Sequence, residues 1–404
     1  MMNNKGRELH QKVEISLFHM FLIYFKIGFV AFGPTAMVET KKNIVKKLGW
    51  ISEKELLEGL AVAQLLPGAT FVSLTVYIGY KLKGLLGALC SFVGFILPSF
   101  FFMTILSWLY FKYQSIAFTN IMFKGLEAIV VALILNAVID LAKTSITNVR
   151  FFFIAAVSFL VSIYYNNVFL LLAFATLMGI LLNLKNEEIP RIINETKMKT
   201  IKWKDIINTS IAVIIFFIIV SYDKNLSNLA EVFFKTGALV FGNGYTMLPI
   251  IQNEAINIHH WINLNQFMVG VALGQMTPGP IIITATFIGY KVMGILGAVV
   301  STIAIFLPSF LLVVITFQIF ERIKNNKYVN SALNGLIATF VGLMMLVVIN
   351  TARHALVDVL TSALFLSALA VLRFTKLDTK WVILIGIGLY LVIYYSQFIF
   401  HFLP

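Results

Sequence analysis

Apolar residues are gathered into long blocks along the chain, and short polar connections separate the blocks. An α-helix rises 1.5 Å per residue, so about 20 apolar residues cross the roughly 30 Å hydrocarbon core of a membrane. Blocks of this kind are predicted near residues 14–38, 56–80, 84–110, 121–142, 150–165, 167–184, 207–222, 230–252, 265–290, 294–320, 332–352, 355–375 and 381–403. The pattern predicts an all-α polytopic membrane protein with about 13 transmembrane segments.

The two halves of the chain repeat each other in sequence. FKIGFVAFG, at residues 25–33, matches FKTGALVFG, at residues 234–242. Matches continue in the same order and at a nearly constant offset, from Pro67-Gly68 with Pro278-Gly279 to Leu97–Phe100 with Leu307–Phe310. Residues that match in this way are called repeat equivalents below. The repetition predicts two six-helix repeats, residues 1–184 and 230–404, joined by a cytoplasmic linker and one connecting transmembrane helix, residues 185–229.

The number of predicted crossings determines the orientation of the second repeat in the membrane relative to the first. Seven crossings precede the second repeat, and this odd number turns it upside down relative to the first, as in transporters with inverted repeats. Lysine and arginine concentrate in alternate connections on the side of the N-terminus, which predicts a cytoplasmic N-terminus and an outside C-terminus.

One connection carries its charges on the wrong side for this topology. It holds the five lysines Lys41, Lys42, Lys46, Lys47 and Lys54. Two explanations remain open. Either the connection folds back as an interfacial helix, or one of the neighbouring blocks, 14–38 or 56–80, is re-entrant and does not cross the membrane.

Composition narrows the classes of function. Apolar residues make up 59% of the chain and charged residues 12%, which excludes an ordinary soluble enzyme. The net charge of +13 comes mostly from connections between blocks, so we expect no nucleic-acid binding. Cys90 is the single cysteine, and the histidines form no cluster with metal-ligand spacing. We therefore expect no metal site, no cofactor and no catalytic residue.

Glycine and proline interrupt equivalent blocks in the two repeats. Gly33-Pro34-Thr35 corresponds to Gly242-Asn243-Gly244, and Pro67-Gly68 to Pro278-Gly279. A broken helix exposes backbone N–H groups that, with the helix dipole, attract an anion. Paired breaks in inverted repeats predict one shared substrate site near the membrane midplane. The alternative is that these prolines only kink helices and these glycines only allow close helix packing.

Polar side chains near the breaks are candidates to hold an anion. Lys26 and Lys235 are repeat equivalents in the middle of apolar blocks, and we expect them to bind a divalent anion unless they reach the membrane surface instead. Gln64 and Gln275 each precede a proline by three residues and have amide groups that donate hydrogen bonds.

Four carboxylates lie in or near the predicted spans and are candidates for proton coupling. They are Glu39, Glu58, Asp140 and Glu254. Their position at helix ends is equally typical of solvated side chains, so the two interpretations stay open.

These segments, together with WISEKELLEGLAVAQLLPG and WINLNQFMVGVALGQMTPGP, resemble the chromate ion transporter family in its long, two-repeat form. The resemblance covers nearly the whole chain and implies an inner-membrane exporter of chromate, with sulfate as the related anion. It assigns functional positions to Gly33, Pro34, Gln64, Pro67, Gly68, Gly242, Gly244, Gln275, Pro278 and Gly279. The chain has FGP where family members often read FGGP, and GNG where they often read GGG.

We therefore expect a secondary transporter that exports chromate, driven by the membrane potential, the proton motive force or both. The sequence contains no nucleotide-binding loop of the form G-x-x-x-x-G-K-[ST], which argues against ATP hydrolysis by this chain. Import or exchange of sulfate or another oxyanion is the alternative within transporters, and a membrane-embedded enzyme or structural protein is the alternative from another class. The expected partners are the oxyanion and membrane lipid, and a homodimer is compatible with the sequence.

Overall fold

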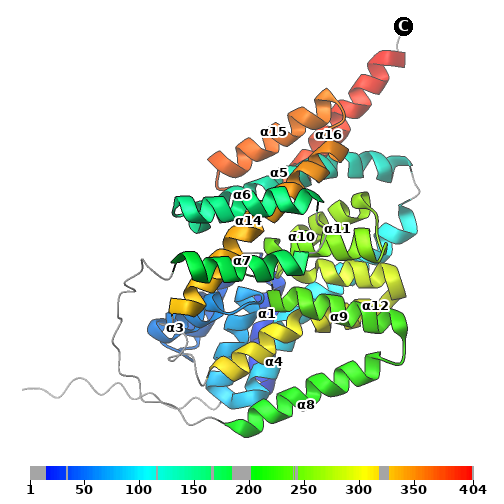
Figure 1. Cartoon of the computed structure of the whole chain (residues 1–404). Coiled ribbons are helices and arrows are strands. Elements are labelled where there is room, and N and C mark those ends of the chain that lie inside the picture. Colours follow the sequence, from blue (N-terminus) through cyan, green and yellow to red (C-terminus); the bar gives the residue numbers. More distant parts are fainter. Residues whose placement is uncertain are drawn as a thin grey trace, which may run out of the picture.

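The computed structural model describes residues 15–32, 35–114, 117–164, 168–183, 202–239, 241, 244–317 and 327–402 (Figure 1). These residues form helices and no β-strand, with one isolated backbone bridge. The all-α fold predicted from the apolar blocks is confirmed. Most of the predicted linker, residues 185–201, lies outside the described residues.

Equivalent elements occur in the same order in the two repeats. The first repeat contains α1 (Leu17–Val30), α2 (Thr35–Thr40), the π-helix η1 (Lys41–Lys47), α3 (Glu53–Leu65), α4 (Thr70–Tyr113), α5 (Ala117–Ser145), α6 (Val149–Tyr164) and α7 (Val168–Asn183). The second contains α9 (Lys224–Leu239), η2 (Tyr245–Met247), α10 (Leu248–Ile251), η3 (Gln252–Ile258), α11 (Leu264–Met276), η4 (Ile281–Ile283), α12 (Thr284–Thr316), α14 (Lys327–Ala355), α15 (Val359–Phe374) and α16 (Thr379–Phe402). The predicted two-repeat architecture is therefore confirmed.

The long helices α4 and α12 each fold back on themselves. The corner lies at Gly84 in α4 and at its repeat equivalent Gly294 in α12, whose φ angles of 62° and 57° are left-handed and suit glycine. The two arms of α4 run side by side on either side of the corner. The Ser91 hydroxyl of one arm donates to the Thr75 carbonyl of the other at 3.0 Å. The two corners separate the apolar blocks at the places that the sequence predicts.

The predicted block 56–80 is a second hairpin and not one long helix. It consists of α3 and the first arm of α4, joined by residues 66–69. Gly59 on α3 lies against the Tyr77 ring, where an added Cβ would come within 2.6 Å of the ring. In the second repeat the Thr284 hydroxyl donates to the Gly270 carbonyl at 3.3 Å across the same kind of hairpin.

The hairpin bears on the five lysines of the first connection. Four of them lie on η1, and the block that follows doubles back as a hairpin. The interfacial helix and the re-entrant block both stay predictions. By length and composition, six helices among the described residues are able to span a membrane. The count of about 13 crossings is not confirmed and stays a prediction.

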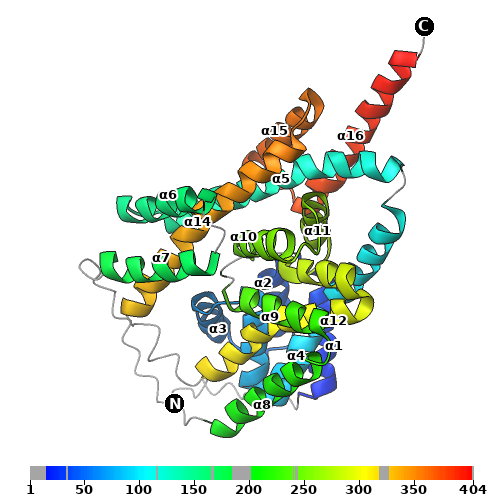
Figure 2. The same ribbon diagram turned by 45° about the vertical axis from the view of Figure 1, so that its right-hand side comes forward.

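Helices of each repeat pack against helices of the other repeat. α14 of the second repeat packs on α6 and α7 of the first, while its equivalent α5 packs on α15 and α16 (Figure 2). The contact is close, since a Cβ on Gly335 of α14 would come within 2.7 Å of the Gly179 Cα atom of α7. Reciprocal contacts of this kind indicate a two-fold relation between the repeats, which is the relation that inverted repeats have.

The connecting helix α8 (Trp203–Val220) lies along the lower edge of the molecule in Figure 1. It packs on α9 and α12, and its outward side chains are exposed and apolar, among them Ile211, Ile214, Ile215, Ile218 and Ile219. We expect membrane lipid to cover this surface, because water would be an unfavourable solvent for it.

Candidate functional site

A cavity of about 330 Å³ lies between the repeats where their helices are broken. The first repeat lines it with Phe32, Thr35, residues 69–71 and one face of α5. The second repeat lines it with residues 244–245, 274–275, 277, 279–282 and 377–380. Both repeats thus contribute to one space, as the paired breaks in the sequence predict.

Four helical segments begin at this cavity. Its lining includes Thr35, Thr70, Tyr245 and Ile281, which are the first residues of α2, α4, η2 and η4. Each segment continues without interruption, η2 into α10 and η3, and η4 into α12. The first N–H groups of a helix have no partner within it and carry the positive end of the helix dipole. The arrangement therefore directs partial positive charge at the cavity.

The Pro-Gly break of the second repeat packs tightly against the first repeat. The N–H group of Gly279 donates to the Ala31 carbonyl at 2.5 Å. Gly279 has a φ angle of 104°, and an added Cβ would lie 1.9 Å from the Ser99 hydroxyl oxygen. Its equivalent Gly68 has a φ angle of 121° and would meet the Ser309 hydroxyl at 2.2 Å. Both positions require glycine for conformation and for space.

Threonines close the first break in each repeat. The Phe32 N–H group donates to the Thr35 hydroxyl oxygen at 2.7 Å, and that hydroxyl donates to the Phe32 carbonyl at 2.9 Å. In the second repeat Phe241 and Thr246 make the same pair of bonds, at 2.9 and 3.1 Å, around a loop that is longer by two residues. Thr35 therefore shapes the break, and it also lines the cavity.

Charged and polar side chains complete the lining. The Lys380 Nζ atom lies 4.0 Å from the centre of the Phe32 ring and 3.8 Å from an Asp378 carboxylate oxygen. The Gln275 amide nitrogen donates to the Tyr245 hydroxyl oxygen at 2.6 Å. These contacts join the breaks of both repeats to the start of α16.

One of the lining carboxylates, that of Asp140, forms an ion pair with Arg373. The Arg373 guanidinium donates to the Asp140 carboxylate at 2.6 Å and to the Asn136 side-chain oxygen at 3.0 Å. Asp140 and Asp378 line the cavity, and Lys380 and Arg373 offset their charges. Because the formal charges balance, the helix starts supply the remaining attraction for an anion.

The structure brings four of the predicted substrate residues into this lining: Thr35, Gly244, Gln275 and Gly279. Pro67, Gly68 and Pro278 lie in the two Pro-Gly loops beside it. Gln64 lines a separate cavity of about 250 Å³ with Asn334 and Phe241. Gly33, Pro34, Gly242 and Asn243 lie outside the described residues.

The two predicted lysines lie elsewhere. Lys26 and Lys235 are exposed on the outer faces of α1 and α9, and neither is among the described residues that line the cavity. Lys235 forms an ion pair with Glu231 one turn earlier on the same helix. Their exposure fits the interpretation in which the lysines reach the membrane surface.

The carboxylates predicted for proton coupling are spread over several environments. Glu39 accepts from the Asn43 amide at 3.1 Å and pairs with Lys42 at 3.4 Å, and Glu58 is exposed. Glu254 is buried between the predicted spans, and burial raises the pKa of its carboxyl group. Of the four candidates, Asp140 is the one found among the described lining residues.

Sequence reasoning missed Lys380, Asn136, Tyr245 and Arg373. Lys380 lies at the polar edge of the last apolar block, and its repeat equivalent is Leu170. Neither the pattern of apolar residues nor the repeat therefore distinguishes it. Asn136 and Asp140 are four residues apart in an apolar helix, which places them on one face. That spacing was the available signal for this side of the cavity.

The described part of the chain contains no candidate metal site. No group of three or more His, Cys, Asp or Glu side chains there is placed to hold a metal ion. The site consists of backbone N–H groups, amides, hydroxyls and a few balanced charges, which suits binding of a small anion.

Sequence comparison assigns the chain to a family. The sequence model described as "Chromate transporter" matches residues 18–180 and again residues 227–392, once on each repeat. The chain belongs to the chromate transporter family. The resemblance predicted from its Gly and Pro motifs is therefore confirmed, and the family is one of transporters.

Similar proteins match over most of their length. An uncharacterized transporter of Methanocaldococcus jannaschii is 32% identical, over 97% of both chains. A chromate transport protein of Cupriavidus metallidurans is 30% identical, over 95% of both chains. One from Pseudomonas aeruginosa is 31% identical, over 83% of this chain and 80% of its own. No solved structure shows a significant match.

Proposed function

We propose that this protein is a secondary transporter that exports chromate across the cytoplasmic membrane. The observation that carries the proposal is the cavity between the repeats, where four helical segments begin around Lys380. Family membership and the similar chromate transport proteins support the choice of anion. Chromate is a tetrahedral dianion, and N–H groups that converge from several directions match its oxygen atoms.

Each group in the cavity has a separate role in this proposal. The helix starts and the Lys380 ammonium attract the dianion, and the Gln275 amide orients one of its oxygens. The ion pair between Asp140 and Arg373 keeps the Asp140 charge from repelling the substrate. Lys26 and Lys235, predicted from the sequence to bind the anion, have no part in it because they lie away from the cavity.

The reciprocal packing of the breaks suggests how the site opens to each side in turn. The Pro-Gly loop of each repeat contacts the other repeat, so a rigid shift of one hairpin releases one loop from its neighbour. In transporters with inverted repeats, such shifts expose a fixed midplane site alternately to the two sides. We propose that the Pro-Gly hairpins are the elements that move.

The membrane potential is sufficient to drive export. Each elementary charge that moves through 100 mV gains about 2.3 kcal/mol, so a dianion leaving an inside-negative cell gains about 4.6 kcal/mol. At about 1.4 kcal/mol for each factor of ten, this supports a gradient above a thousandfold. Proton coupling is then an addition, and Asp140 in the cavity is the carboxylate best placed for it.

Import or exchange of sulfate is the second candidate, because the same groups recognise any tetrahedral dianion. Inverted membrane vesicles separate the two, since their interior corresponds to the cell exterior. We expect vesicles from cells that express the protein to accumulate labelled chromate, and we expect accumulation to fall when the membrane potential is collapsed. Higher chromate inside intact expressing cells than in cells without the protein would contradict export.

A further inference from the structure

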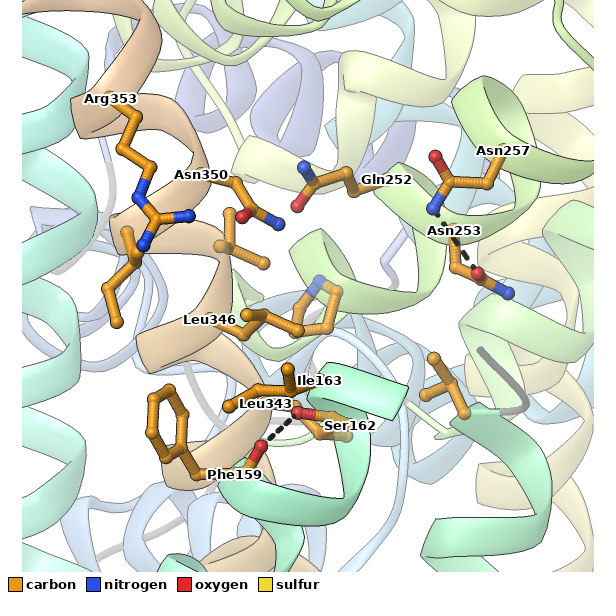
Figure 3. Close-up of a pocket in the computed structure, with 14 residues that line it drawn as sticks. Phe159, Ser162, Ile163, Gln252, Asn253, Asn257, Leu343, Leu346, Asn350 and Arg353 are labelled. Atoms are coloured by element: carbon orange, nitrogen blue, oxygen red, sulfur yellow. Dashed lines mark hydrogen bonds between the residues drawn. The ribbon is translucent and has the colours of Figure 1, made fainter. Parts of the chain in front are cut away.

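A second cavity, of about 370 Å³, lies between the repeats (Figure 3). The first repeat lines it with the end of α6 and the first residue of α7. The second repeat lines it with Pro249, Gln252, Asn253, Asn257 and the last turns of α14. It shares no described lining residue with the cavity beside Lys380.

The polar side of this cavity consists of one cation and several neutral donors. Arg353 and Asn350 come from α14, while Gln252, Asn253 and Asn257 come from the π-helix η3. Figure 3 shows the Asn350 and Gln252 amides pointing toward each other across the cavity, with the Arg353 guanidinium beside Asn350. No aspartate or glutamate is among its described lining residues.

Comparison of the repeats explains why there is space here. In the other half, Asn136 and Asp140 of α5 bind Arg373 of α15, and this ion pair bridges the two helices. The repeat equivalents of these three residues are Leu346, Asn350 and Ile163, and all three line the cavity. The guanidinium is thus replaced by a shorter aliphatic side chain, and the carboxylate by an amide.

The change in side chains also changes which ligand fits. A carboxylate at residue 350 would repel an anion, whereas the Asn350 amide is able to donate to one. The only charged side chain in the described lining is Arg353, whose planar guanidinium matches two oxygens of an oxyanion. A cation would find carbonyl oxygens there but no carboxylate to offset its charge.

We propose that this cavity is a second binding site for a tetrahedral oxyanion of the sulfate and chromate type. The identity of the anion rests on the proposed function, whereas the site itself rests on Arg353 and the amides around it. Each chain then binds two anions at once, one beside Lys380 and one beside Arg353.

Equilibrium dialysis of the purified full chain with radiolabelled sulfate tests the proposal. We expect the wild type to bind two sulfate ions per chain. In Arg353→Gln the second site should bind sulfate at least about tenfold more weakly, so at sulfate concentrations that fill both wild-type sites the variant should bind about one ion per chain. Lys143→Gln is the matched control, because Lys143 is the exposed repeat equivalent of Arg353 and is not among the described residues lining either cavity. It should retain both sites.

A second variant tests the same cavity without removing its cation. Ile163→Arg combined with Asn350→Asp rebuilds the ion pair of the other half, so it should fill the cavity and leave one sulfate per chain. Binding of a single sulfate that Lys380→Gln abolishes and Arg353→Gln preserves would overturn this inference and leave the proposed function intact. Loss of one of two sites in Arg353→Gln, with no effect of Lys380→Gln, would support the second site and contradict the first. Absence of sulfate and chromate binding to the wild type would overturn both.

Discussion

The hydroxyl of Ser99 in the first repeat donates a hydrogen bond of 2.5 Å to the carbonyl of Pro278 in the second. Its repeat equivalent Ser309 accepts a bond of 3.0 Å from the N–H group of Ala69 in the first repeat. Both serines are fully buried. Each repeat therefore holds the Pro-Gly break of the other, and the two bonds help to fix the shape of the cavity beside Lys380.

Removal of the Ser99 hydroxyl should loosen this contact. In Ser99→Ala the Pro278 carbonyl loses its partner in a buried place, and such a loss costs about 1–3 kcal/mol. We expect a lower thermal unfolding temperature in detergent and slower chromate transport. Ser107→Ala is the control, because Ser107 is a buried serine of the same helix whose hydroxyl donates to the carbonyl of Met103, one turn earlier. Equal losses in both variants would contradict a special role for Ser99.

Alanine at Gly279 should be more damaging than alanine at most glycines of the chain. Its Cβ would overlap the Ser99 hydroxyl, and the left-handed backbone costs a further 1–2 kcal/mol or so. We expect Gly279→Ala to lose transport and Gly388→Ala, which has open space around it, to retain it. The double variant Gly279→Ala/Ser99→Ala removes the overlap and should recover part of the protein yield. Full activity of Gly279→Ala would show that the break is not packed as described.

Loss of the charge at Lys380 should weaken anion binding. A hydrogen bond to a charged group contributes about 1.5–3 kcal/mol, so Lys380→Gln should raise the chromate concentration for half-maximal transport by about tenfold or more. Lys376→Gln makes the same charge change four residues earlier at an exposed position and should have little effect. An unchanged concentration dependence in Lys380→Gln would remove this residue from the site.

The start of α3 should make stability depend on pH. Partial burial disfavours the charged form of Glu55, but bonds from Ser52 and from Lys81, at 2.9 Å, prevail and lower its pKa to about 2. Because the folded pKa lies below the unfolded value of about 4.3, this stabilisation is present above that pH and is lost as the pH falls toward 2. We expect Glu55→Gln to lower the unfolding temperature at neutral pH, with the difference from wild type shrinking in acid. A difference independent of pH would contradict the account.

The predicted topology is open to a direct check. Reporters that work on one side of the membrane should give opposite results when fused after Lys204 and after Phe402, because an odd number of crossings is predicted between them. The same side for both fusions would contradict the inverted arrangement of the repeats.

The sequence was sufficient to predict the repeats and the breaks, since both appear as residues that recur in order. Gln275 and Gly279 were found in this way, and both line the cavity. The inward face of α1 could not be predicted from the sequence, because its residues are apolar on nearly all sides of the helix. On α1 the buried side contains Tyr24, Ile27 and Gly28, and Lys26 points away from it.

Contacts between distant segments were the other part that the sequence could not supply. Lys380 meets Phe32 only because the start of α16 folds against the first break, and no local pattern encodes that meeting. A re-entrant block was one of the two explanations for the five lysines of the first connection. The hairpin that α3 and α4 form could not be predicted in detail, because it depends on packing such as that of Gly59 against Tyr77. These contacts depend on the sizes of the side chains that meet, and a pattern of apolar and polar residues contains no information about which side chains meet.

The central claim, that the cavity beside Lys380 holds the transported anion, is tested most directly by anomalous diffraction from chromium in crystals of the protein grown with chromate. The account predicts a chromium peak within the cavity, between Lys380 and Gln275 and near the starts of α4 and η4. A protein that transports chromate but shows no chromium peak in this cavity would contradict it.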